Sequence, residues 1–272
     1  MRVRCFCHTH AIVMHASVVQ GLIMNLPLLE IKDVYKQYSG EDKYALKGVS
    51  LDIYPGEVLG LLGVNGAGKT TLSSIIGTLR PPTQGDVLFN GESIYKDIPG
   101  YRSQLGFCPQ RPNLNPLLTL RQNLEFAGCY FGMSEDEITN RMQELEKSLG
   151  IAKFLNKKSP QLSGGWKQRY LIARTLMHSP KLVIFDEPTV ALDPDVRNQL
   201  WYYIKELRDQ GVSVLLTTHY LEEAEQLSDR VCVLDKGVVK LVDTPNNLMK
   251  SFEKHRLEDV FLHLTQDSGN DN

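Results

Sequence analysis

A glycine-rich segment that ends in lysine and two threonines has the residue types needed for chemistry on phosphates. Residues 63–71 read Gly-Val-Asn-Gly-Ala-Gly-Lys-Thr-Thr, which matches G-x-x-x-x-G-K-[ST]. Glycine has no Cβ, so the backbone N–H groups of such a loop can curl around phosphate oxygens. Lys69 would bring a positive charge to the β- and γ-phosphates, and the Thr70 hydroxyl can bind Mg²⁺. The segment therefore indicates binding of a nucleoside triphosphate.

Two adjacent carboxylates form the second candidate site. The apolar run 182–185 predicts a buried strand, and it is followed by Asp186 and Glu187. Burying charge is costly, so the pair needs a reason, and open α/β sheets bind ligands at these strand ends. Asp186 would hold Mg²⁺ through water, and Glu187 would polarise an attacking water molecule. The alternative is an acidic pair that caps a helix.

A third segment, Leu162-Ser163-Gly164-Gly165, comes directly before a predicted helix. Taken alone, Ser163 predicts only an N-cap. The two glycines also leave backbone N–H groups directed outward at a helix start, which suits an anion.

The elements around these segments alternate between strands and helices, which predicts an α/β fold with a mainly parallel sheet covered on both faces. A helical block at about residues 111–178 interrupts the alternation, and a capping box at Ser134 and Glu137 starts one of its helices. The predicted strands are 28–34, 46–54, 58–62, 86–89, 105–108, 181–185, 212–217, 231–235 and 238–241. The predicted helices are 71–79, 120–130, 134–149, 166–178, 195–210 and 221–227.

Composition excludes several classes of protein. The 272 residues are 42% hydrophobic with a net charge of −2, so bulk electrostatics do not indicate a nucleic-acid partner. No run of 18 apolar residues is present, so any membrane role would need a partner protein. The five cysteines are scattered and odd in number, which favours a reducing cytosol over a disulfide framework.

The first residues differ from the rest of the chain. Residues 1–27 are expected to be an extension outside the native fold, and Met24 is a candidate start. Two alternatives stay open: a metal site built from Cys5, Cys7 and three histidines, or a secretory signal. At the other end, 246–272 is expected to be a helical tail with a frayed terminus.

The ordered set of motifs resembles the ATPase subunit of ATP-binding cassette (ABC) transporters over about residues 28–245. The resemblance implies a P-loop core with an N-terminal antiparallel β subdomain and an inserted helical subdomain. It implies ATP as substrate, Mg²⁺ as cofactor, and catalysis by Glu187, His219, Gln110 and Lys69. Mg²⁺ would be held by Thr70, Gln110 and Asp186. ATP would be bound by Tyr38, Gly63, Asn65, Gly66, Ala67, Gly68, Lys69, Thr70 and Thr71.

The resemblance also implies a dimer in which Ser163, Gly164 and Gly165 complete the ATP site of the opposite subunit. Asp193, in Ala191-Leu192-Asp193, would connect the two sites. The expected partners are a transmembrane permease and a second ATPase subunit, in a homodimer or a heterodimer. The expected location is the inner face of the cell membrane.

The chain departs from the family pattern at a few positions. Val64 stands where the family often has proline. Trp166 replaces the glutamine that usually follows the family's signature segment, residues 162–165, so any polar contact of that glutamine is lost. Tyr35 or Tyr44 could stack on adenine instead of Tyr38. Trp166 followed by Lys-Gln-Arg, and the segment 258–262, resemble exporter-type bacterial members.

Two other functions compete with transport. A soluble ABC-type ATPase in an assembly or repair process has the same motifs, although translation factors carry two cassettes and repair members carry long coiled-coil insertions. The more distant alternative is an unrelated P-loop GTPase or kinase. A GTPase would need Asn-Lys-x-Asp to bind guanine, whereas residues 156–159 read Asn-Lys-Lys-Ser.

Overall fold

The structure is a computed structural model that describes residues 26–190 and 192–266. The alternative sites in the first 23 residues, the interpretation of Met24 and the frayed terminus lie outside these residues, as does Ala191. No helix in the described ranges is long and apolar enough to cross a lipid bilayer.

The central sheet is mainly parallel, as the strand–helix alternation predicted. In the described part of the chain five strands run parallel, and the sixth, β10, pairs antiparallel with β9 at one edge. The order is β10 (Val238–Asp243), β9 (Arg230–Asp235), β3 (Val58–Leu62), β8 (Ser213–Thr218), β7 (Leu182–Asp186) and β6 (Leu105–Cys108). The carboxyl ends of β3, β7 and β8 therefore lie beside one another, and they are followed by Gly63, Glu187 and His219.

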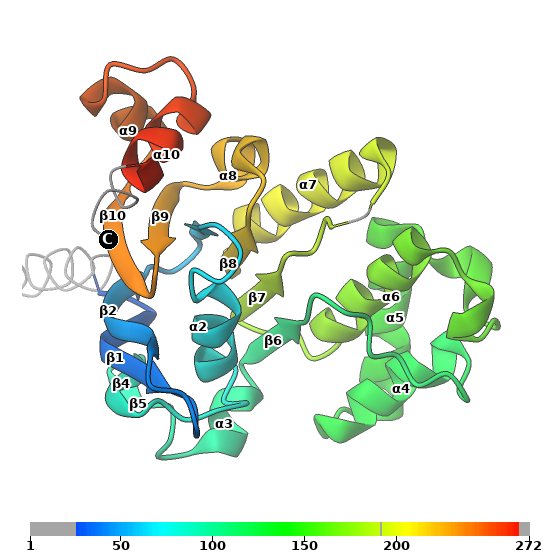
Figure 1. The fold of residues 1–272 in the computed structure, drawn as a ribbon. Coiled ribbons are helices and arrows are strands. Elements are labelled where there is room, and N and C mark those ends of the chain that lie inside the picture. The colour runs from blue at the N-terminus through cyan, green and yellow to red at the C-terminus, as the bar shows by residue number, and fades with distance from the viewer. Residues whose placement is uncertain (1–25, 191, 267–272) are drawn as a thin grey trace, which may run out of the picture.

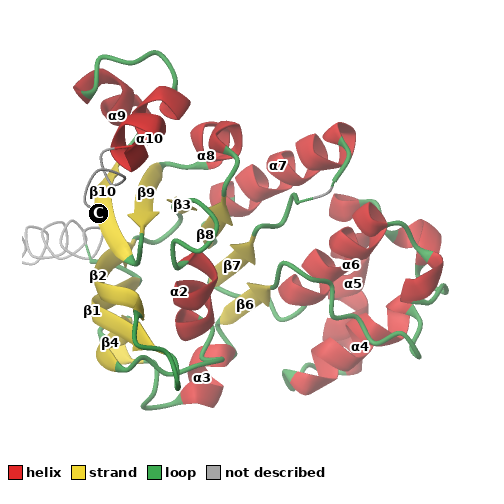
Figure 2. Ribbon diagram, in the orientation of Figure 1, coloured by secondary structure: helices red, strands yellow, loops and turns green. Residues whose placement is uncertain are grey.

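Both faces of this sheet are buried, and alternate residues of each strand point to different cores. In β7, Val183 and Phe185 pack with the helical block and α7 (Pro194–Asp209), whereas Leu182 and Ile184 pack on the side of α2 (Lys69–Ile76). This two-sided burial explains why the strand sequences are continuously apolar. Figure 2 shows α2 and α7 among the helices that flank the sheet.

A second sheet is antiparallel, as expected for the N-terminal part. Its order is β2 (Tyr44–Ile53), β1 (Leu29–Gln37), β4 (Gln84–Phe89) and β5 (Glu92–Ser93). Its apolar residues share one core with α2, so it packs against the helix that begins at the phosphate loop. The short β5 and the helix α3 (Ile98–Arg102) were not predicted.

The helical block lies beyond β6, and Figure 1 shows it in green at the opposite end of the sheet from β10. A capping box at Ser134 and Glu137 starts α5, as predicted, and Gly150 ends it in the left-handed conformation. The block contains α4 (Leu120–Tyr130), α5 (Glu135–Leu149), two short 3₁₀ turns (Ala152–Phe154 and Ser159–Gln161) and α6 (Gly164–Leu176).

The last described elements are α8 (Leu221–Leu227), α9 (Pro245–Ser251) and α10 (Leu257–Gln266). Leu257 and Val260 of α10 are fully buried in a small core with Ala224 of α8. The boundaries of the predicted domains remain a prediction. The helix predicted at 71–79 is shifted: it begins at Lys69 and ends at Ile76, because Gly77 closes it and Thr78 takes a φ of 54°.

Candidate active site

The loop between β3 and α2 requires glycine at several positions for different reasons. Gly68 occupies the N-cap of α2 with a φ of 112°, and Gly66 has a φ of 83°. A Cβ on Gly63 would lie 2.5 Å from the carbonyl oxygen of Leu234, so only glycine fits there. A Cβ on Gly66 would meet nothing within 4 Å. Its backbone therefore borders open space at the N-terminus of a helix, where an anion binds favourably.

Lys69 is the first residue of α2, and its side chain turns back into this loop. The residue is only 4% exposed. Its Nζ atom donates a hydrogen bond of 2.8 Å to the carbonyl oxygen of Gly63 and lies 3.3 Å from Oε1 of Glu187. A buried cation is thus held beside the loop by a carbonyl and a carboxylate from another strand end.

The carboxylate of Glu187 is the centre of the site. Its Oε1 faces Lys69, and its Oε2 accepts a hydrogen bond of 2.8 Å from Nε2 of Gln110. Nδ1 of His219 lies 3.4 Å from the same Oε2, without the alignment of a hydrogen bond. The structure therefore brings together Lys69, Gln110, Glu187 and His219, the four residues to which catalysis was assigned.

The backbone of Glu187 is unusual for a residue with a large side chain. Its φ is 50°, in the left-handed region. Its N–H is held by the carbonyl oxygen of Thr217 at 3.1 Å and by the hydroxyl of the same residue at 3.0 Å. The sharp turn after β7 directs the carboxylate to the phosphate loop instead of along the strand.

Asp186 is tied to two hydroxyl groups. Its Oδ1 accepts a hydrogen bond of 2.7 Å from Thr217 and lies 3.5 Å from the hydroxyl oxygen of Thr70. Burial raises the pKa of Asp186, the hydrogen bond from Thr217 opposes this shift, and the charge of Glu187 adds to it. Sequence reasoning missed Thr217. Its signal was a hydroxyl on β8, where Thr217 pairs with Asp186 across the parallel strands.

The donor set fits Mg²⁺. The hydroxyl of Thr70 and the carboxylate of Asp186 are hard oxygen ligands, and they already lie at hydrogen-bonding distance from each other. Gln110 lies nearby through its contact with Glu187. The described residues contain no cluster of three carboxylate, histidine or cysteine ligands, so the remaining ligands would be water and the phosphate oxygens of a substrate.

The four residues Lys69, Gln110, Glu187 and His219 border one cavity of about 470 Å³. The predicted residues Tyr38, Gly63, Ala67 and Asp186 are outside its wall, and so are Ser163, Gly164, Gly165 and Asp193. The lining residues are Ala45, Asn65, Gly66, Gly68, Lys69, Thr70, Thr71, Gln110, Glu187, Val190 and His219.

Tyr38 is connected to the site through its hydroxyl, which lies 3.1 Å from Oγ1 of Thr71. The guanidinium carbon of Arg80 lies 5.3 Å from the centre of the Tyr38 ring. Tyr35 and Tyr44 instead pack edge to face on each other, with ring centres 5.9 Å apart. The geometry therefore favours Tyr38 over the other two tyrosines as the ring beside the phosphate loop.

The signature segment presents its polar groups to solvent. Ser163 and Gly164 are exposed, and Ser163 stands at the N-cap of α6 without a side-chain capping bond. Ser163 is therefore the N-cap residue, as its type predicted, but its hydroxyl makes no capping hydrogen bond. Trp166 packs edge to face on Phe154 at 4.7 Å, and the Arg169 guanidinium lies 4.9 Å from the Trp166 ring. Trp166 thus belongs to the packing of the helical block.

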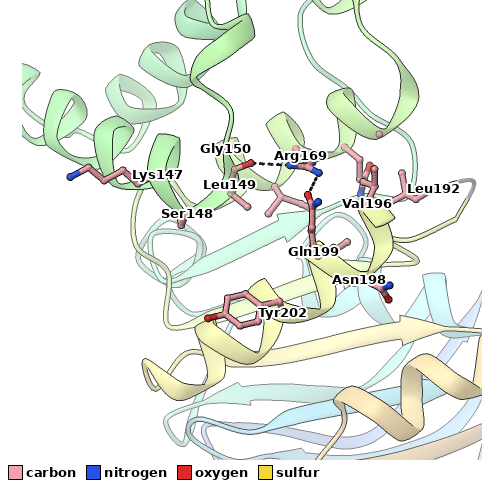
Figure 3. A pocket seen from close by; sticks show the side chains of 14 residues that line it. Lys147, Ser148, Leu149, Gly150, Arg169, Leu192, Val196, Asn198, Gln199 and Tyr202 are labelled. Atoms are coloured by element: carbon pink, nitrogen blue, oxygen red, sulfur yellow. Dashed lines mark hydrogen bonds between the residues drawn. The ribbon is translucent and has the colours of Figure 1, made fainter. Parts of the chain in front are cut away.

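A second cavity, of about 450 Å³, separates the helical block from α7 (Figure 3). Arg169 bridges it: its guanidinium donates to the carbonyl oxygen of Leu149 at 3.3 Å and to the side-chain oxygen of Gln199 on α7. Gly165 of the signature and Leu192, next to the exposed Asp193, both line this cavity. The helical block and α7 are therefore not tightly packed beside Gly165 and Leu192.

Comparison with known proteins identifies the family. The sequence model described as "ABC transporter" matches residues 46–190. The chain belongs to the ABC transporter family. It is 37% identical to Nod factor export ATP-binding protein I of Cupriavidus metallidurans over 82% of this chain and 73% of that protein. It is also 37% identical to the linearmycin resistance ATP-binding protein LnrL of Bacillus subtilis over 81% of this chain and 70% of that one.

Solved structures agree with this assignment. The ATP-binding subunit of an ABC transporter superposes with a TM-score of 0.81 at 32% identity, covering 88% of this chain and 99% of that one. The dimeric ATP-binding cassette MJ0796, in a post-hydrolysis state with ADP and phosphate, superposes with a TM-score of 0.73 at 33% identity, covering 79% and 98%. This ABC subunit is therefore an ATP-binding protein and an ATPase, as the motifs predicted.

Proposed function

We propose that this ABC ATPase hydrolyses ATP at the Lys69–Glu187 site and uses the energy to drive export through a separate membrane permease. The direction of transport rests on the two relatives, one of which is named for export and the other for resistance. The observation that supports the site is the convergence of three side chains on the carboxylate of Glu187.

The contacts of Lys69 suggest how substrate binding would prepare the site. Lys69 is paired with Glu187 at 3.3 Å. When the phosphate chain of ATP becomes the counter-charge of Lys69, Glu187 loses a partner and can accept a hydrogen bond from water. The water oxygen then attacks the γ-phosphorus, its proton passes toward Glu187, and the bond to the β-phosphate oxygen breaks to give ADP and phosphate.

The other site residues would orient this step. Gln110 donates to Glu187 and fixes the direction of its carboxylate, while His219 lies on the other side of the same oxygen and would contact the γ-phosphate. Thr70 and Asp186 would hold Mg²⁺, which when bound neutralises charge on the phosphate oxygens. Thr217 keeps Asp186 and Glu187 in place from the neighbouring strand.

A dimer would complete the site. Ser163 and Gly164 are exposed at a helix N-terminus and do not line the cavity of their own chain. A second subunit could receive them over its bound phosphates, which is the arrangement that an uncapped Ser163 favours. Release of phosphate would remove this contact and let the helical block move across the loose boundary with α7.

The permease would dock in a groove between the helical block and the core. Leu79, Phe126 and Tyr130 are 59%, 66% and 68% exposed there, a large apolar surface for a soluble domain. Arg102 and Arg174 border it and bond to neutral oxygens of Thr78 and Asn113. We infer an occupant with an apolar face and an acidic residue, namely a cytoplasmic helix of the permease.

This groove connects to the site through β6. Leu105 and Phe107 of β6 form part of its wall, and Gln110 follows that strand by two residues. A shift of the docked helix would therefore reach the carboxylate of Glu187. Such a subunit would lie on the inner face of the membrane, held there by its permease.

The Glu187→Gln variant tests the proposed site. The amide keeps the shape but accepts protons poorly, so we expect turnover to fall about 10²–10⁴-fold. Binding of a fluorescent ATP analogue should remain, and Mg·ATP should shift the variant to a dimer in size-exclusion chromatography with light scattering. Hydrolysis at the wild-type rate would reject Glu187 as the base, and a monomer at saturating Mg·ATP would reject the dimer.

A further inference from the structure

A buried carboxylate on α8 is not explained by the site described above. Glu223 lies four residues after His219, and it is 0% exposed. Burial of a carboxylate opposes folding unless the group is paired or serves a function. Glu223 does not line the ATP cavity, so it does not act on the substrate directly.

The surroundings of Glu223 come from both catalytic segments. Its Oε1 accepts a hydrogen bond of 3.0 Å from the indole nitrogen of Trp201 on α7. Burial raises the pKa of Glu223, while the polar groups of Thr218, Trp201 and Thr189 and the charge of Arg197 counteract this shift. Thr218 directly precedes His219, and Thr189 follows Glu187 by two residues.

Arg197 links the same helix to His219. Its guanidinium lies 5.2 Å from the centre of the Tyr220 ring, which is 4.2 Å from the His219 ring. The backbone N–H of Tyr220 donates a hydrogen bond of 2.9 Å to the hydroxyl of Thr218. Two contacts thus join α7 to the segment after β8: Trp201 with Glu223, and Arg197 with Tyr220 beside His219.

This cluster is incompletely hydrogen-bonded. Oε2 of Glu223, Oγ1 of Thr189 and Nε of Arg197 are buried atoms without a well-aligned hydrogen bond. An unsatisfied buried polar group is costly, so a small relative movement of α7 and α8 that pairs these atoms would be favourable. Such a cluster responds to the relative position of the two segments, whereas an apolar contact would not.

We propose that Glu223 is a positioning residue that fixes the His219 segment relative to the chain from Glu187 to α7. The carboxylate accepts the hydrogen bond from Trp201 of α7, while Glu223 itself belongs to α8, the helix that follows His219. His219 and Glu187 meet at 3.4 Å only if β7 and β8 present their following loops in register. This inference rests on the proposed roles of Glu187 and His219.

The test compares Glu223→Gln, Trp201→Phe and the double variant in the full chain. Both single changes alter the contact in the cluster without altering the ATP cavity. We expect kcat to fall about tenfold in each because the catalytic residues are misplaced, while KM for Mg·ATP stays within about twofold. The double variant should lose about as much as either single variant, since both act through one contact.

Matched controls come from the same helices. Glu222→Gln and Tyr202→Phe change exposed neighbours and should retain wild-type kcat. Thermal unfolding midpoints are measured for every variant. A kcat within twofold of wild type in both single variants would overturn the proposal, and so would a rise in KM that matches the loss. If Glu223→Gln does not fold, Trp201→Phe decides alone.

Glu187→Gln separates this inference from the proposed function. If that variant is inactive but Glu223→Gln and Trp201→Phe are normal, the catalytic assignment stands and the role of Glu223 is wrong. If Glu187→Gln hydrolyses ATP normally, the proposed site fails. A loss of activity that disappears at lower temperature, together with a lower unfolding midpoint, would assign Glu223 to stability alone.

Discussion

Lys69 and Glu187 form a buried ion pair, with Nζ 3.3 Å from Oε1 and side chains only 4% and 9% exposed. The two residues come from different strand ends and are both needed for the proposed reaction. Breaking such a pair leaves an uncompensated charge in the interior. The proposed catalytic centre therefore also joins the phosphate loop to the end of β7 through a buried ion pair.

Lys69→Met should destabilise the nucleotide-free protein by about 2–4 kcal/mol, because it leaves Glu187 buried without its cation. In the Glu187→Gln background the same change should cost less, with a coupling energy of about 1–3 kcal/mol. Urea unfolding of the four proteins in this cycle measures the coupling. Additive effects would show that the pair contributes nothing to the fold.

Asp186→Asn should stabilise the protein at neutral pH while abolishing hydrolysis. Burial raises the pKa of Asp186 above its ordinary 3.8, so the folded protein holds the proton more tightly than the unfolded chain. The favourable contribution is complete below the unfolded pKa and is lost as pH rises through the folded pKa. At neutral pH the ionised group therefore opposes folding, whereas asparagine keeps an acceptor for Thr217.

The free energy of unfolding should rise by about 1 kcal/mol at pH 7.5, which is the order of the cost of burying one polar group. This gain should shrink as the pH falls toward 4. Urea unfolding from pH 4.5 to 8 measures it, with Asp42→Asn in an exposed loop as the control. If the gain in stability does not change with pH, it does not come from the ionisation of Asp186, and the prediction is wrong.

Ser163→Arg should block dimerisation without weakening the monomer. The hydroxyl is exposed and caps nothing, so the unfolding free energy should change by less than about 0.5 kcal/mol. ATP binding to the monomer should be retained, but the large side chain should prevent the ATP-dependent dimer and lower turnover at least about 10²-fold. Asp136→Arg, exposed on α5, is the control. An active dimer of Ser163→Arg would refute the role of this segment in trans.

Phe126→Asp tests the proposed docking groove. Phe126 is 66% exposed, so the fold and the ATPase activity of the isolated subunit should stay within about twofold of wild type. Co-purification with the permease should be lost, because a carboxylate replaces the central apolar contact. Tyr202→Asp, an exposed aromatic on α7, should retain the complex. Retention by Phe126→Asp would place the permease on another surface.

Local patterns predicted much of this fold. The observed ends of four elements agree with the predicted ends, because apolar runs or helical periodicity stop abruptly there. These elements are β3, β6, α4 and α8. The motifs also predicted that Lys69, Glu187 and His219 come together, as the structure shows. The short β5 and α3 have too few residues to show a period, and for the segment of α9 and α10 only a helical tail without separate bounds was predicted.

The details of the site depend on contacts between distant segments, which local patterns do not contain. Nothing in the neighbourhood of residue 69 indicates that Glu187 would be its partner. Thr217 looks like an ordinary strand residue until the register places it opposite Asp186. Glu223 lies in a run of acidic residues that resembles a solvated helix face, whereas Glu223 is buried and its neighbour Glu222 is exposed. Its environment is set by α7, not by α8.

The left-handed backbone at Glu187 has a consequence for protein engineering. Glycine would relax this turn, with a local gain of about 1–2 kcal/mol, but it would remove the carboxylate and leave Lys69 buried without its ion-pair partner. Relaxing the backbone at this residue would therefore sacrifice both the proposed base and the ion pair. A more heat-stable variant that remains active has to gain its stability at other residues, on surfaces that do not contact the nucleotide.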